Sequence, residues 1–473
     1  MSIVRRTPLC LALCLFAVNA QANGTTSLDR DTVENAQKLA LASESGSEAY
    51  AILESLTSEV GPRMAGTPAF DRAVVWAQEK FKALGYDKVY LEPVTFPTWE
   101  RRHEAAQILA PFPQKLMVTA LGGSVGTGAT PLDAEVIEFA TLDALKAAPA
   151  GSLTGKIAYI SNRMARHKDG SGYGPAVVAR SGASDAASKG AVALIIRSIG
   201  TDSDRLPHTG MQRYAEGGLK IPAAALSNPD ADLLSNIIRR GKPVTVRLDI
   251  DAGMSGKLKT EHNVIGEIRG RSKPDEVVVI GGHLDSWDLG TGAVDDGAGV
   301  AITMAAGAMI GRLDKAPART IRVVAFANEE QGLFGGRAYA ETHKAEIDQQ
   351  QLGAESDFGA GRIYAFRAGV ADEARPVIEQ IGQLLAPLGI AYEATGGEPG
   401  PDIGPFAKAG MPWGDLAQDG TDYFDLHHTA NDTLDKVEAK ALDQQVAAYA
   451  VMAYAAANSP VDFGRAPPIE EQK

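Results

Sequence analysis

Side chains of the kinds that bind metal ions stand in small groups in the second half of the chain. The segment VVVIGGHLDSWDLGTGAVDDGAGV (277 to 300) places His283 and Asp285 two residues apart, then Asp295 and Asp296 in a glycine-rich loop. Taken singly, such groups are commonly structural or solvated, and the sequence DDG is often only a turn. Similar groups recur later, at Glu329 and Glu330, at Asp357, and at His427 and His428.

These groups follow apolar runs that have the character of buried strands. The runs are continuous rather than alternating, which is typical of strands covered on both faces. They are NVIGEI (263 to 268), EVVVIGG (276 to 282), TIRVVAFA (320 to 327) and RIYAFRA (362 to 368). Helices are expected at 297 to 313, 334 to 345, 371 to 388 and 438 to 457. This alternation predicts an α/β fold with a mixed, mostly parallel sheet covered by helices.

The carboxyl ends of such strands form the ligand-binding edge of the sheet. Because the groups lie at strand ends and in a late loop, we expect them to converge at this edge. Both cysteines, Cys10 and Cys14, lie in a segment expected to be removed, so no thiolate ligand remains. The sequence therefore predicts a metal centre built from histidine and carboxylate side chains.

The N-terminus has the layout of a signal peptide. Arg5 and Arg6 precede the apolar run LCLALCLFAV, and small residues stand at Ala20 and Ala22. We therefore predict a signal peptide at 1–22 and a periplasmic or secreted protein. The apolar run is too short for a stable membrane span. The formal net charge of -13 argues against a nucleic-acid partner, since an acidic surface repels phosphates.

A length of 473 residues suggests about two to three domains. Helices are expected at 30 to 60 and 68 to 86, strands near 87 to 96 and 104 to 110, and a crossing between units in LGGSVGTGAT (121 to 130). Short strands and two helices predict a small β-rich unit at 131–252, in which His167 and His208 are expected at the surface. The unit would interrupt a larger domain formed by 23–130 and 253–473.

Several motifs resemble those of the exported di-zinc exopeptidases, the family of bacterial leucyl aminopeptidase and glutamate carboxypeptidase. The motifs are GGHLDSWDLGTGAVDDGAGV, ANEEQGLFGG, AESDFGAG, PDIGPFAKAG and HHTANDT, and the likeness runs from GPRMAGTPAF to the last helix. The resemblance implies the zinc exopeptidase fold, with 131–252 as an inserted protease-associated domain. It also implies hydrolysis of short peptides or dipeptides, and a homodimer as the assembly.

Carried over residue by residue, the resemblance implies two zinc ions per chain. His283 and Asp357 would bind one ion and Glu330 and His428 the other, with Asp295 as the bridge. Neighbouring residues cannot easily point the same way, so Glu329 would be free to act as general base.

Three further catalytic or supporting roles have open alternatives. The carboxylate of Asp285 would accept the free ring N–H of His283, or it caps a turn. Tyr423 would donate a hydrogen bond to the oxyanion, or it packs. Trp287 would line the pocket or support its loop. Asp296 is expected to cap a helix, and His427 to point away from the site.

Two other functions remain open on the sequence alone. One is a glutaminyl cyclase-like enzyme with a single zinc ion, and the other is an inactive receptor-like binding protein. The terminus that is recognised is also open: Asp419, Asp422 and Asp425 would attract an α-amine, or they are solvated loop acids.

Overall fold

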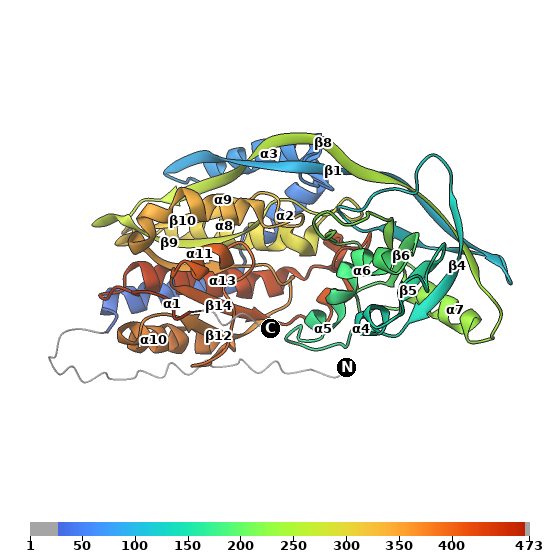
Figure 1. Cartoon of the computed structure of the whole chain (residues 1–473). Coiled ribbons are helices and arrows are strands. Elements are labelled where there is room, and N and C mark those ends of the chain that lie inside the picture. Colours follow the sequence, from blue (N-terminus) through green and yellow to red (C-terminus); the bar gives the residue numbers. More distant parts are fainter. Residues whose placement is uncertain (1–26, 469–473) are drawn as a thin grey trace, which may run out of the picture.

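The computed structural model describes residues 27–468 (Figure 1). The predicted signal peptide at 1–22, with Cys10 and Cys14, lies outside the described residues. One helical stretch of the described part, Ala293–Gly311, has the length and hydropathy of a membrane span. Of its apolar window, 94% is buried inside the protein, which is the burial of a core helix.

The sheet that carries the site has four parallel strands at its centre, in the order β14-β11-β9-β10. These strands are β9 (Lys273–His283), β10 (Arg319–Phe326), β11 (Gln350–Glu355) and β14 (Trp413–Gln418). Antiparallel strands flank them, β12 (Ile363–Gly369) beside β14 and β8 (Thr245–Ile268) beside β10, and β13 (Ala391–Tyr392) pairs with β12. The predicted mixed, mostly parallel sheet is confirmed for this part of the chain.

Both faces of this sheet are covered by apolar helices. Along β9, Val278 and Ile280 face a core shared with α8 (Ala298–Gly311) and α13 (Ala439–Ala457). The alternate residues Val277 and Val279 face a second core with α9 (Phe334–Thr342) and α11 (Gly404–Lys408). Because side chains alternate between the two faces of a strand, the residues from Val277 to Ile280 must all be apolar to fill both cores. The remaining large helices are α1 (Arg30–Ser45), α2 (Ala49–Ser55), α3 (Pro68–Ala83) and α10 (Arg375–Leu385).

A long two-stranded ribbon leads from this domain to the β-rich unit. Strand β1 (Lys88–Ala110) pairs antiparallel with β8 over nearly its whole length (Figure 1). The separate strands expected near 87 to 96 and 104 to 110 are therefore one strand. Its irregularities are three shifts of register, between Pro97 and Trp99, between Arg101 and His103, and between Ile108 and Ala110, which indicates bulges rather than a break.

The segment between the two ribbon strands continues the sheet. Strand β4 pairs with β8, and β4, β5, β6 and β7 are parallel neighbours, with β3 antiparallel at the edge. Their bounds are β3 (Val118–Ala120), β4 (Leu132–Phe139), β5 (Ile157–Ile160), β6 (Ala193–Arg197) and β7 (Ala223–Leu226), with helices α4 (Leu142–Lys146), α5 (Tyr173–Val177), α6 (Ala183–Ser188) and α7 (Asn228–Ile238). The expected boundary at 252 falls inside β8, and β3 lies before the expected boundary at 131.

Candidate metal centre

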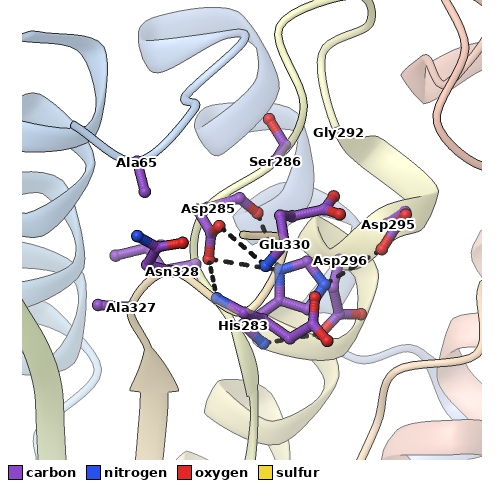
Figure 2. Close-up of polar contacts among 12 residues, drawn as sticks. Ala65, His283, Asp285, Ser286, Gly292, Asp295, Asp296, Ala327, Asn328 and Glu330 are labelled. Carbon is purple, nitrogen blue, oxygen red and sulfur yellow. Dashed lines mark hydrogen bonds and ion pairs between the residues drawn. The ribbon is translucent and has the colours of Figure 1, made fainter. Parts of the chain in front are cut away.

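The metal-binding types of side chain collect at the carboxyl ends of the parallel strands. His283 is the last residue of β9, while Glu330 follows β10 and Asp357 follows β11. Figure 2 shows His283, Asp295 and Glu330 gathered at this edge. Their side chains are almost fully buried, and Asp357 is 10% exposed. The convergence expected from strand ends is therefore present in the structure.

Asp295 lies between two pairs of potential ligands. Its Oδ1 is 3.1 Å from Nε2 of His283, and the same nitrogen is 3.5 Å from Oδ1 of Asp357. Its Oδ2 is 3.2 Å from Nε2 of His428, and that nitrogen is 2.9 Å from Oε2 of Glu330. One carboxylate oxygen thus faces each pair, as a bridging ligand requires.

The spacing of these atoms fits metal ions. Bonds of ~2.0 to 2.1 Å from a tetrahedral ion to nitrogen and oxygen set the ligand atoms ~3.3 Å apart, close to the distances above. Among residues 27–468, the buried atoms Oδ2 of Asp295 and Oε1 of Glu330 have no hydrogen-bond partner. Ligand atoms of His283, Asp295 and Glu330 also lie within 4.8 Å of one another. A set of imidazole and carboxylate donors suits zinc.

Asp285 supports the centre differently from the expected way. Nδ1 of His283 is 3.0 Å from the main-chain oxygen of Asp285 and 3.6 Å from its carboxylate. The carboxylate instead accepts hydrogen bonds from the main-chain N–H of Glu329, at 3.0 Å, and from that of Glu330, at 3.4 Å (Figure 2). Asp285 therefore orients the ring mainly through its carbonyl, and its side chain fixes the loop that follows β10.

Asp296 caps the start of α8, as expected. Its Oδ1 accepts from the N–H of Gly299 at 3.1 Å, and its Oδ2 accepts from the N–H of His283 at 3.0 Å. The carboxylate thereby ties the end of β9 to the first turn of the helix. It also forms a possible ligand group with His283 and Asp357.

Glu329 and Tyr423 lie in the field of these carboxylates. Burial raises the pKa of Glu329 well above its ordinary value, and Asp357 and Glu330 raise it further, against the opposing effect of His283. Burial likewise raises the pKa of Tyr423, with added repulsion from Asp295 and Asp357. The Tyr423 ring packs 5.1 Å from that of Phe358. Tyr423 is thus a packing residue that also lies close enough to the centre for its carboxylates to raise the pKa of the Tyr423 hydroxyl.

His427 does not point away from the site, contrary to expectation. Its ring stacks on that of His428 with centroids 3.5 Å apart, and its Nε2 is 3.7 Å from Oδ2 of Asp295. His428 itself has φ 62, a left-handed conformation that non-glycine residues adopt rarely.

The expectation that His208 lies on the surface is wrong. Its side chain is 0% exposed, with Nε2 2.7 Å from Oδ1 of Asp202 and Nδ1 2.7 Å from the main-chain oxygen of His427. The loop that carries it packs onto the HHTANDT loop, and no local pattern in the sequence reveals that contact. His167 is exposed, as expected.

Two buried residues that hold the site loops escaped sequence reasoning, although both lie inside the quoted motifs. The Arg63 guanidinium donates to the main-chain oxygens of Leu284, Thr291 and Gly292 at 2.5 to 2.9 Å. The Asp432 carboxylate accepts from the N–H groups of the metal-site loop at Val294, 2.6 Å, and Asp295, 3.2 Å.

Trp287 lies against the ligand side of the centre. It is 3% exposed, and its ring contacts those of His428 and Trp99 edge to face, with centroids 5.8 and 6.3 Å apart. This burial agrees with the role of a support for the loop.

A cavity of about 380 Å³ opens beside Asp357. Acidic side chains dominate its charged lining, and its one lining cation, Arg367, is paired with Glu393 at 2.6 Å and Asp415 at 3.2 Å. The lining carboxylates are those of Asp169, Glu355, Asp357, Glu398 and Asp415.

The three acids of the loop before His427 are engaged elsewhere. Arg166 binds Asp422 at 2.8 Å and Asp425 at 2.6 Å. Asp419 accepts from the Thr421 hydroxyl at 2.6 Å. These pairings give the three carboxylates structural roles, whereas the cavity beside Asp357 is lined by other acids.

The fold and the site together define a metallopeptidase. The model of Peptidase family M28 matches residues 263–453. Carboxypeptidase Q of Bos taurus is 35% identical over 429 residues, which cover 90% of this chain and 89% of that protein. Carboxypeptidase Q of Homo sapiens is 35% identical over 421 residues, 89% of this chain and 87% of that protein. The chain belongs to peptidase family M28, which confirms the resemblance seen in the sequence.

Solved structures agree with this assignment. A peptidase M28 precursor from Shewanella amazonensis SB2B superposes with a TM-score of 0.90 at 52% identity, covering 93% of this chain and 99% of that chain. A zinc aminopeptidase from Bacillus subtilis has a TM-score of 0.60 at 20% identity, covering 85% and 93%. The second likeness is one of fold alone.

Proposed function

We propose that the chain is an exported di-zinc exopeptidase that hydrolyses short peptides or dipeptides. The observation that carries the proposal is the Asp295 carboxylate, with one oxygen toward His283 and Asp357 and the other toward His428 and Glu330. Two metals that share a carboxylate need this arrangement. The name of the relatives, carboxypeptidase Q, supports exopeptidase chemistry, and the imidazole and carboxylate donors suit zinc.

In this proposal the ligand pairs divide between two ions. His283 and Asp357 hold one zinc, Glu330 and His428 hold the other, and Asp295 binds both. When bound, the two ions lower the pKa of water and polarise the scissile carbonyl.

The protein's own groups then handle the protons. Glu329 takes the proton from the attacking water and delivers it to the leaving amine. The Asp285 carboxylate keeps Glu329 in place by accepting a hydrogen bond from the main-chain N–H of Glu329. The Tyr423 hydroxyl donates to the developing oxyanion.

The acid-lined cavity beside Asp357 supports recognition of a free amino end. A substrate ammonium placed there would meet carboxylates rather than unpaired cations. Free-amine, N-acetylated and C-amidated dipeptides test this point. Cleavage restricted to N-acetylated peptides would contradict it.

Three further proposals complete this function. We assign 131–252 as a protease-associated domain, residues 1–22 as an export signal that leads to the periplasm or the medium, and a homodimer as the assembly. N-terminal sequencing of the exported protein tests the cleavage site, and sedimentation tests the dimer.

Metal content measured beside peptide hydrolysis tests the catalytic assignment. Glu329→Gln keeps its shape and binds no metal, so two zinc ions should remain while the rate falls about 10²- to 10⁴-fold. Asp295→Asn removes the anionic bridge, so zinc content should fall together with activity. A single zinc in the active wild-type protein would favour the glutaminyl cyclase-like alternative. Two bound zinc ions without any peptide hydrolysis would favour the inactive receptor.

A further inference from the structure

The loop at 198 to 212, which belongs to the β-rich unit, lies directly on the His427–His428 segment. Thr209 makes two contacts with His428: its N–H donates to the His428 main-chain oxygen at 3.0 Å, and its own main-chain oxygen is 3.3 Å from Nδ1 of the ring. The second contact leaves Nε2 of His428 facing Asp295 and Glu330. Thr209 therefore occupies the place of the outer partner that a metal-binding histidine requires.

His208 secures the neighbouring residue of the same segment. Its Nδ1 lies 2.7 Å from the main-chain oxygen of His427, and its Nε2 lies 2.7 Å from Oδ1 of Asp202. The ring therefore bridges the main chain at His427 and the carboxylate of Asp202. The ring fills its space completely, since a Cβ at Gly200 would lie 2.3 Å from it.

Further contacts join the two segments. Arg180 donates to the main-chain oxygen of Thr209 at 2.7 Å, the same oxygen that faces His428. The N–H of Thr201 donates to the main-chain oxygen of Phe424 at 3.1 Å. The N–H of His208 itself donates to the Ser198 hydroxyl at 2.8 Å, so the loop is fixed from within as well.

The conformation of His428 explains why such support is needed. Its φ of 62 lies in the left-handed region, which a non-glycine residue keeps only when its surroundings impose it. The hydrogen bonds from Thr209 and His208 to the main-chain oxygens of His428 and His427 supply that constraint. Without them the segment can relax and carry Nε2 of His428 away from Asp295.

We propose that His208, held by Asp202, is a positioning residue for the zinc ligand His428, so that this metal position is completed by the β-rich unit. The proposal rests on the di-zinc function proposed above. It assigns the 198 to 212 loop a role in metal binding, although the loop itself supplies no metal ligand in this proposal. The effect acts on the position held by Glu330 and His428 and leaves the position held by His283 and Asp357 unchanged.

The test compares His208→Ala with wild type by zinc competition against a chromophoric chelator. Loss of the outer partner itself typically lowers metal affinity about 10- to 100-fold. Since His208→Ala lets Thr209 and its contact with His428 shift, we expect a loss of up to this size for one of the two ions. His208→Asn retains a donor near the position of Nδ1 and should recover part of the affinity. His167→Ala, an exposed histidine of the same unit, is the matched control and should match wild type.

A second measurement needs no metal and separates positioning from general damage. The zinc-free His208→Ala protein is compared with zinc-free wild type. Hydrogen exchange in the variant should be faster in the peptide that contains His427 and His428 and unchanged in strands β9 and β10. Asp202→Asn leaves the ring in place and should show a smaller effect in the same direction, which covers the case that His208→Ala does not fold.

Two outcomes would overturn the proposal. One is wild-type zinc affinity at both positions in His208→Ala, and the other is exchange that rises equally throughout the protein. The zinc count of the wild-type protein tests the di-zinc function separately. If it shows one ion, the exchange measurement still decides whether His208 holds the segment.

Discussion

Arg63→Met should loosen the loop that carries the first metal-site residues. Arg63 is fully buried, and its guanidinium donates to three main-chain oxygens between Leu284 and Gly292. Methionine keeps much of the apolar volume but supplies no donor. Leaving a buried acceptor unpaired costs about 1 to 3 kcal/mol, so three acceptors imply a loss of about 3 to 9 kcal/mol before the loop relaxes.

The same figure can be expressed as a melting temperature. An unfolding entropy of about 2.1 cal/mol/K per residue gives ~1 kcal/mol/K for a chain of this length, so Tm should fall by roughly 3 to 9 °C. Circular dichroism on the zinc-loaded and zinc-free proteins measures the shift.

Two further variants sharpen the test. Arg63→Lys keeps the charge but lacks the planar guanidinium fork that reaches three carbonyl groups at once. Its Tm should therefore lie between those of wild type and Arg63→Met. Arg72→Met is the control, because Arg72 is exposed and donates to the main-chain oxygen of Pro68 in its own helix. An Arg63→Met protein that melts within about 1 °C of wild type would refute the reasoning, since a 3 kcal/mol loss corresponds to more than that.

Three other predictions concern pH, packing and metal removal. Burial raises the pKa of Glu261 to about 7, so the folded protein keeps a proton that the unfolded chain has already released at the ordinary pKa of a glutamate. Stability is therefore lost as the pH rises between these two pKa values. The Tm of Glu261→Gln should rise relative to that of wild type between about pH 5 and 8. A constant difference in Tm would contradict this. A Cβ at Gly299 would lie 1.8 Å from the main-chain oxygen of Ser356, so Gly299→Ala should lower Tm and zinc content together. A well-folded variant with full zinc content would show that the backbone at Ser356 can move aside. Removing zinc with a chelator should lower Tm, because the clustered carboxylates then repel one another, and an unchanged melting curve would exclude metal binding at this site.

The strand-end groups were predictable because local patterns define them. The apolar run before His283 specifies a strand covered on both faces, and a parallel strand delivers the residues after it to the ligand-binding edge. Asp357 follows β11 in the same way. Helix starts were similarly accessible, as the hydrogen bond from the Gly299 N–H to Asp296 shows.

The support of the site was not predictable in the same way. His208 contacts His427 across 219 positions of sequence, and no periodic pattern links the two loops. The division of the Asp285 contacts, carbonyl toward His283 and carboxylate toward Glu329, depends on backbone angles that residue types do not specify. The two strands expected near 87 to 96 and 104 to 110 are the single strand β1, because the ribbon accommodates Pro97 with a register shift beside it.

The ribbon also bears on how such a chain can gain or lose parts during evolution. Ala110 and Thr245 are direct partners at its far end, so everything between them enters and leaves the fold at neighbouring points, ~5 Å apart. A gene could drop this segment and close the gap with a short hairpin, leaving the catalytic sheet continuous. The same deletion would remove Thr209, whose main-chain oxygen faces the His428 ring. Descendants that shed the segment would therefore have to acquire a new acceptor for that histidine, and the two changes should be inherited together.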